Sequence, residues 1–202
     1  MLSNKFLILS ILGVLLVSSG VTQAEKMHGL AMHGVPKYDK NFTHLSYVNP
    51  DAPKGGTLRF GSYGSFDNLN RVAFKGSKAS GLGYINDTLM RRVWDEAFTL
   101  YGLIAEYADM PEDRSSITFF INPDARFHDG NPITRDDVLF SLHTFQTKGT
   151  PNQKKTYGKV VETQMIGDNG IKMIFVDNED KELPLIVAGF LPIIPKKYYE
   201  AI

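Results

Sequence analysis

Two stretches of the chain alternate apolar and polar residues, which is the pattern of a β-strand with one buried face. In GGTLRFGSYG, Leu58 and Phe60 alternate with Thr57 and Arg59. In SSITFFIN (115–122), apolar residues again occupy every second position. We therefore expect a strand in each stretch.

A spacing of three and four residues between apolar positions predicts a helix before the second of these strands. Leu82, Ile85, Leu89 and Val93 would share one face of this helix. We expect it to end near Trp94.

A turn followed by a capped helix is predicted after the second strand. The stretch PDARFHDGNP favours a turn, because Gly tolerates positive φ, Asp and Asn bond their own backbone, and Pro fixes φ. Thr134 then precedes Asp137 by three positions, the capping-box spacing in which each side chain satisfies a backbone N–H at a helix start. The expected buried face of this helix consists of Val138, Leu142 and Phe145.

The last third of the chain combines a hairpin, a loop and a helix. Two apolar runs flank Asn169 and Gly170, the pair that most strongly predicts a β-hairpin. The basic stretch 147–159 predicts an exposed loop, and the apolar run 183–190 predicts a short helix. Because strands and helices are mixed and no repeat occurs, we predict a fold of the α+β class.

Residues 1–24 have the pattern of a cleaved export signal. Lys5 precedes an apolar run, and the small residues Thr22 and Ala24 fit the positions that a signal peptidase reads, so we expect cleavage after Ala24. The apolar run is shorter than the roughly 20 residues that span a bilayer. The 202 residues include no cysteine, which excludes disulfide bonds and a lipidated cysteine from this sequence. We therefore expect a periplasmic protein.

Charge and metal-ligand spacing exclude two classes of partner. Lys and Arg total 22, as do Asp and Glu, so no nucleic-acid partner is expected, and the lysines within 147–159 predict a solvated face. His28 and His33 are five positions apart, which does not place them on one helix face, and no Cys or acidic residue completes a metal site. We predict no metal and no cofactor, although these histidines leave a nickel- or haem-binding protein as an alternative.

His128 and Asp129 allow two interpretations. As an acid/base pair they would belong to an exported hydrolase, but such an enzyme also needs a nucleophile or a metal, and no Gly-x-Ser-x-Gly motif or cysteine is present. Adjacent residues in a turn point apart, which disfavours a base and its orienting acid. We favour a turn and predict no catalytic residue.

Several stretches are together similar to one protein family, and they occur in the family's order. They are YVNPDAPKGGTLR, GSFDNLNR, the segment from LIAEYADMPEDR to DDVLFS, and LPIIPKKYYE. This set resembles the family 5 extracellular solute-binding proteins, which deliver peptides to ABC importers. The HGLAMHG opening is most similar to the YejA-like subgroup. Members of the family are several times longer, so we expect that the chain is truncated at Ile202.

The resemblance implies part of the first lobe of a two-lobed periplasmic binding protein (type II), with the second lobe absent. The core of that lobe would comprise 25–96 and 193–202, and a satellite subdomain, 97–192, would be inserted between them. A monomer without enzymatic activity would hold an oligopeptide between its lobes through main-chain hydrogen bonds and deliver it to an inner-membrane ABC permease.

Carried onto this chain, the resemblance places four residues at the ligand cleft. The loop after FDNLN would border it, which points to Phe74, Lys75 and Gly76, with Gly76 allowing a close approach of the backbone. Tyr157 in the basic stretch would reach the same cleft. The alternatives are a packed Phe74, a solvated Lys75 and a surface Tyr157.

Overall fold

The computed structural model describes residues 26–73, 75–176 and 179–201. The cleavage expected after Ala24 lies outside the described residues. Within the described ranges, no helix has the length and apolar character needed to cross a bilayer.

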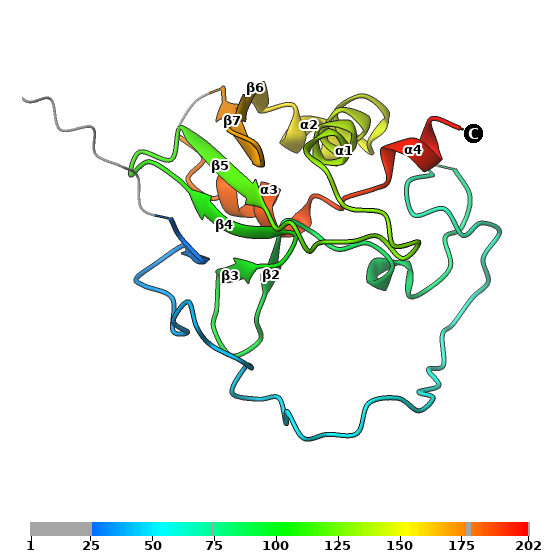
Figure 1. Ribbon diagram of the computed structural model, residues 1–202. Coiled ribbons are helices and arrows are strands. Elements are labelled where there is room, and N and C mark those ends of the chain that lie inside the picture. Colours follow the sequence, from blue (N-terminus) through cyan, green and yellow to red (C-terminus); the bar gives the residue numbers. More distant parts are fainter. Residues whose placement is uncertain (1–25, 74, 177–178, 202) are drawn as a thin grey trace, which may run out of the picture.

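Two antiparallel sheets form the body of the protein (Figure 1). The larger sheet has the order β4-β5-β7-β6, with β4 at Ala105–Asp109, β5 at Ser116–Ile121, β7 at Gly170–Phe175 and β6 at Val160–Ile166. The smaller sheet has the order β1-β3-β2, with β1 at Gly29–Ala31, β3 at Thr99–Gly102 and β2 at Met90–Arg92. Together with the helices, they confirm the α+β class.

The strand expected within 115–122 is confirmed as β5. Ile117 and Phe119 are fully buried, as the alternation predicts. Thr118, on the opposite face, is buried as well. β5 lies between β4 and β7, so neighbouring strands pair with both of its edges.

The hairpin is confirmed, and its turn lies one position earlier than the Asn-Gly pair suggests. Ile166 pairs with Gly170, so the turn consists of 167–169 and Gly170 begins β7. Gly167 has a φ of 52°, which glycine adopts without strain. Asn169 donates from Nδ2 to the carbonyl oxygen of Ile121 (3.0 Å), so the turn is tied to β5.

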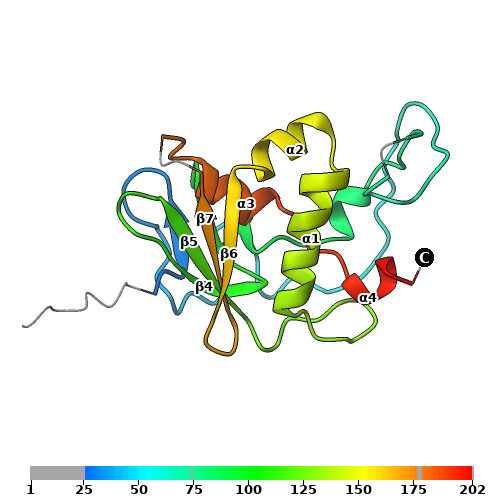
Figure 2. The same ribbon diagram turned by 90° about the horizontal axis from the view of Figure 1, so that it is seen from above.

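Helix α1 (Arg135–Lys148) begins at the expected capping box, in which Thr134 and Asp137 satisfy each other's backbone N–H groups. Its predicted face, Val138, Leu142 and Phe145, is buried. The helix lies beside β6 (Figure 2), where Gln146 donates to the carbonyl oxygen of Val160 at 2.9 Å. Helix α3 (Leu183–Phe190), also confirmed, packs against β2 and β3.

The loop expected over 147–159 was wrong in part, because it contains α2 (Pro151–Tyr157). Thr150 and Gln153 form a second capping box, and Pro151 occupies the first helical turn, where its missing N–H has no cost. Lys154 and Lys155 lie on this helix and Lys159 follows it, whereas Lys148 ends α1. The short α4 (Lys196–Tyr199) follows Pro195 near the end of the chain.

The helix expected to end near Trp94 was also wrong. Only Leu82–Tyr84 are helical, as one 3-10 turn, and β2 follows. Met90 pairs with Gly102 of β3, and it is fully buried together with its neighbour Leu89. Two adjacent buried residues do not fit one narrow helix face. Pairing with β3, a later strand, therefore overrides the helical spacing of the apolar residues.

The strand expected in GGTLRFGSYG does not form, and this prediction was wrong. Leu58 and Phe60 are 76% and 81% exposed, and the segment runs as an arc away from both sheets (Figure 1). A single strand is not stable without a partner for its backbone groups. The described residues place no such partner beside it.

Segments far apart in the sequence meet beside α1. The amide of Ile193 donates to the carbonyl oxygen of Asp87 at 2.9 Å, and Thr88 pairs with Pro192 as an isolated antiparallel bridge. The segment before β2 therefore lies beside the segment that follows α3. The division into a core and a satellite subdomain at 96/97 and 192/193 stays a prediction.

Candidate functional site

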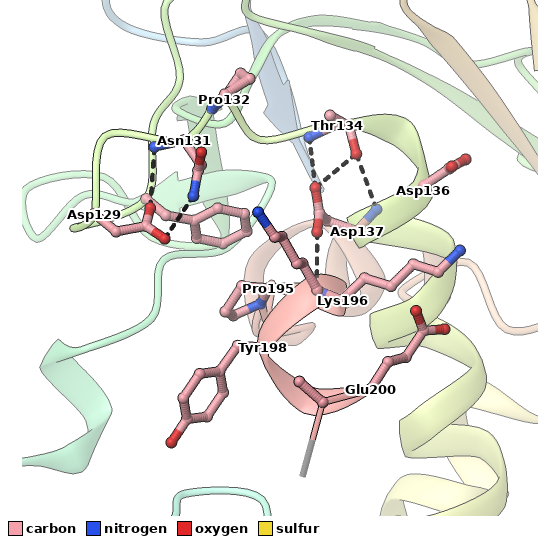
Figure 3. Close-up of a pocket in the computed structure, with 13 residues that line it drawn as sticks. Asp129, Asn131, Pro132, Thr134, Asp136, Asp137, Pro195, Lys196, Tyr198 and Glu200 are labelled. Carbon is pink, nitrogen blue, oxygen red and sulfur yellow. Dashed lines mark hydrogen bonds between the residues drawn. The ribbon is translucent and has the colours of Figure 1, made fainter.

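A groove lies between the turn that precedes α1 and the C-terminal helix α4. It consists of two adjoining hollows of about 730 Å³ and about 270 Å³. Both are lined by Phe127, Asp129, Pro195 and Tyr198. Figure 3 shows the larger hollow, which residues of the turn and of α4 line from opposite sides.

The turn on one side of the groove is fixed by Asp129. Its carboxylate accepts the backbone N–H of Asn131 at 3.0 Å and the side-chain amide of the same residue at 2.7 Å (Figure 3). These bonds hold the pKa of Asp129 below its usual range. Gly130 has a φ of 83°, and its N–H donates to the carbonyl oxygen of Phe127. The prediction of a turn at this position is confirmed.

Asp137 connects the two sides of the groove. One carboxylate oxygen accepts the N–H and the hydroxyl of Thr134, and the other accepts the N–H of Lys196 at 2.9 Å. One turn later on α1, the buried hydroxyl of Ser141 accepts the N–H of Ile194 at 2.9 Å. The start of α4 is thus anchored to α1 through its backbone.

The groove is lined by polar groups that can bind but are not arranged for catalysis. His128 is exposed beside the smaller hollow, and the carboxylate of Asp129 bonds Asn131, so it does not orient the imidazole. Both lysines and acidic residues line the larger hollow, among them Asp136, Lys196, Lys197 and Glu200. Such a surface suits a polar ligand or another polypeptide better than bond cleavage.

Tyr198 lines both hollows of the groove and is 60% exposed. Sequence reasoning did not select it. The local sequence does not show which side of the helix after Pro195 faces the turn. The next residue, Tyr199, reaches the 67–78 loop, where its hydroxyl donates to Oδ1 of Asn70 at 3.4 Å.

Of the residues expected at the ligand cleft, Lys75 and Gly76 lie on the 67–78 loop. Lys75 is exposed, and its carbonyl oxygen accepts Nδ2 of Asn68 at 3.0 Å. Gly76 has a φ of 84°, and a β-carbon there would press on the side chains of Asp67 and Asn68. Glycine is therefore required by the loop itself. Phe74, the other residue predicted at the cleft, lies outside the described residues.

Tyr157, the fourth expected residue, ends α2 and is buried. Its hydroxyl donates to the carbonyl oxygen of Phe190 at 2.9 Å, which ties α2 to α3. Burial raises the pKa of Tyr157 to about 12. These contacts are those of a packing residue, and a role for Tyr157 at a ligand stays a prediction.

The two histidines considered as metal ligands are not brought into a common cluster. His28 bonds through its ring to the carbonyl oxygen of Tyr38 at 2.8 Å, and His33 is exposed. In the part of the chain that the structure describes, no group of three or more His, Asp or Glu side chains is placed to hold a metal ion.

Two curated relatives match most of this chain. The peptidoglycan-binding protein YepA of Agrobacterium fabrum is 39% identical over 196 residues, which are 93% of this chain and 32% of YepA. A protein named as a probable peptide-binding protein, YejA of the same bacterium, is 39% identical over 172 residues, 85% of this chain and 28% of that protein. The chain thus spans about a third or less of the length of these relatives.

A solved structure and a family profile agree with these relatives. A mannohexaose-bound periplasmic oligopeptide-binding protein of Thermotoga maritima has a TM-score of 0.52 at 19% identity, over 62% of this chain and 23% of that protein, which supports the fold. Residues 99–201 match the profile of the bacterial extracellular solute-binding proteins, family 5. The matched range includes the larger sheet, helices α1–α4 and every residue that lines the larger hollow of the groove. The chain therefore belongs to the family 5 bacterial extracellular solute-binding proteins, which bind solutes and are not enzymes.

Proposed function

We propose that this chain supplies part of the first lobe of a periplasmic protein that captures oligopeptides and delivers them to an inner-membrane ABC permease. The observation that carries the proposal is its membership of family 5 together with 39% identity to the YejA relative. The exposed His128 and the carboxylate of Asp129, which bonds Asn131, support binding without catalysis.

The expected mode of binding is an extended peptide gripped between two lobes. Main-chain groups of the peptide would pair with the protein backbone, which gives affinity that does not depend on peptide sequence. The 67–78 loop and the groove at Tyr198 are the surfaces of this chain that we expect to face the peptide. They are joined by the contact between Tyr199 and Asn70.

Affinity arithmetic predicts that the chain alone binds peptides weakly. A micromolar complex corresponds to roughly −8 kcal/mol, and if a second lobe supplies about half of this, the remainder corresponds to a dissociation constant in the millimolar range. We expect this value for the 202-residue chain.

Calorimetric titration with mixed short peptides tests the proposal. The chain is measured alone and after fusion to the part of the Agrobacterium YejA that it does not match. We expect weak, millimolar binding by the chain and micromolar binding by the fusion. A fusion that unfolds cooperatively but binds no peptide, under conditions in which the intact relative does, would refute the proposal. Micromolar binding by the chain alone would refute the proposal that the peptide is gripped between two lobes.

A second candidate ligand is a peptidoglycan fragment. The YepA relative is named for peptidoglycan binding, and its match extends over 93% of this chain. The same titration with a muropeptide that carries both sugar and peptide separates the candidates. Tighter binding of the muropeptide than of its free peptide would favour this ligand, whereas equal binding favours oligopeptides.

A further inference from the structure

Arg71 is a half-buried residue of the 67–78 loop, and no acidic side chain of the described residues forms an ion pair with it. Burial lowers the pKa of its guanidinium, because the charged form is partly removed from water. Desolvated charges in proteins are normally paired, so an unpaired one marks a place where a group of opposite charge can bind.

The hydrogen bonds of Arg71 leave one edge of its guanidinium open. Nη1 donates to the carbonyl oxygens of Asn86 at 3.2 Å and of Gly83 at 3.4 Å. Nε and Nη2 have no hydrogen-bond partner among the described residues. These two nitrogens form one of the edges of a guanidinium that can bind both oxygens of a carboxylate at once. The side chain is therefore held through one nitrogen, and the edge that suits a carboxylate is available.

Arg114 shows the contrasting arrangement of an arginine that serves the fold. Its Nη1 donates to the carbonyl oxygen of Lys181 at 2.9 Å, and its Nη2 donates to that of Met32 at 3.1 Å. Both terminal nitrogens of Arg114 are thus used to join segments of the protein. Arg71 uses only one of its terminal nitrogens in this way within the described ranges.

The surroundings of Arg71 are basic and lie beside the groove. The 67–78 loop carries three cations, Arg71 among them, and one acidic residue. That acidic residue, Asp67, already accepts the N–H of Ser77 at 2.8 Å. Asn86, whose carbonyl oxygen holds Arg71, lines the smaller hollow of the groove. An anionic group of a ligand in the groove would therefore be attracted towards Arg71.

We propose that Arg71 binds a carboxylate of the captured peptide through Nε and Nη2. The carboxylate is either the C-terminus of the peptide or an acidic side chain. The inference rests on the proposed function, because it takes the ligand to be a peptide. Pairing with the peptide backbone alone does not set where a peptide begins or ends, whereas a carboxylate bound at Arg71 would fix its position along the cleft.

NMR titration of the isotope-labelled chain tests the inference at the millimolar affinity expected for the chain alone. The probes are trialanine, trialanine amide and the amide of Ala-Glu-Ala, all at one ionic strength. At least one of the two peptides with a carboxylate should bind at least about 10-fold more tightly than trialanine amide and should shift the Nε–H signal of Arg71. Tighter binding of trialanine assigns the C-terminus, and tighter binding of the Ala-Glu-Ala amide assigns the acidic side chain.

Arg71→Gln should remove the preference for a carboxylate, because glutamine lacks the charge and the paired donors of arginine. The affinity for trialanine amide should stay unchanged, which general disruption of the loop would not allow. Loss of the Nε–H signal in this variant also identifies the signal of Arg71. Arg59→Gln is the matched control and should keep the preference, because Arg59 is exposed and bonds no other described residue.

Four results would overturn the inference. They are equal affinity for all three peptides, a preference that survives in Arg71→Gln, a preference without a shift of the Arg71 signal, and a general loss of peptide binding in Arg71→Gln. In each of these cases the unaltered chain still binds peptides, so the proposed function is retained. Failure of the unaltered chain to bind any of the three peptides would overturn the inference and would also count against the proposed function.

Discussion

One carboxylate, that of Asp137, holds two elements together. It satisfies the N–H of Thr134 at the start of α1 and the N–H of Lys196 at the start of α4. Asp137 lines the groove, where a ligand-binding acid would also lie. Because both of its oxygens accept hydrogen bonds from the protein, its role is to position the backbone.

We predict that Asp137→Ala lowers the free energy of unfolding by about 2–3 kcal/mol, because a cap is lost and the N–H of Lys196 loses its acceptor. Urea unfolding measures the change. Asp136→Ala is the control, since Asp136 is exposed and complements only the helix dipole, which is worth about 0.3–1 kcal/mol. Equal losses of unfolding free energy in the two variants would show that the hydrogen bonds accepted by Asp137 do not stabilise the protein.

Tyr157 gives the protein an alkaline stability limit. Its pKa is about 12 in the folded state and near its ordinary value of 10.0 when unfolded. Its contribution is therefore complete below pH 10 and is lost as the pH rises from 10 towards 12, because only the unfolded state then releases the proton. Burial also raises the pKa of Tyr101 to about 12. Part of the fall in stability with rising pH is therefore due to Tyr101.

We predict that Tyr157→Phe costs about 0.5–1.5 kcal/mol at neutral pH, because the carbonyl oxygen of Phe190 loses its donor. The variant should also lose stability less steeply than the unaltered chain above pH 10. Urea midpoints measured from neutral pH to about pH 11 check both effects. Tyr84→Phe, with an exposed ring, should change neither quantity, and an unchanged alkaline slope in Tyr157→Phe would contradict the assignment.

At the scale of elements, α2 depends on its own capping box. Thr150→Ala should destabilise the protein by about 1 kcal/mol, because the N–H of Gln153 loses its acceptor. Thr147→Ala makes the same change at an exposed position of α1, where the hydroxyl bonds only the carbonyl oxygen of His143, and should have little effect. Thermal unfolding monitored by circular dichroism measures the loss of stability in both variants. A larger loss in Thr147→Ala than in Thr150→Ala would contradict the prediction.

Elements with local signals were predicted correctly, and those that depend on distant partners were not. The caps of α1 and the hairpin between β6 and β7 are specified within a few residues, and the sequence therefore predicted them. β2 forms because Met90 meets Gly102 of β3, and the arc at 57–60 stays unpaired because no partner lies beside it. Neither outcome can be derived from apolar spacing alone.

At the scale of the molecule, the groove was beyond sequence reasoning for the same reason. Its two sides, the turn at Asp129 and the helix with Tyr198, are far apart in the sequence and meet because Asp137 and Ser141 hold the backbone of 194–196. The turn was predictable from its residue types. The apposition of the two sides depends on the tertiary fold.

The position of β1 at the edge of the smaller sheet has a consequence for how the protein is made. Gly29–Ala31 pair with Thr99–Tyr101 of β3, so β1 has no neighbouring strand until some seventy further residues have been synthesised. During translation β1 therefore has no partner strand at first, and the smaller sheet closes only after β3 has been synthesised.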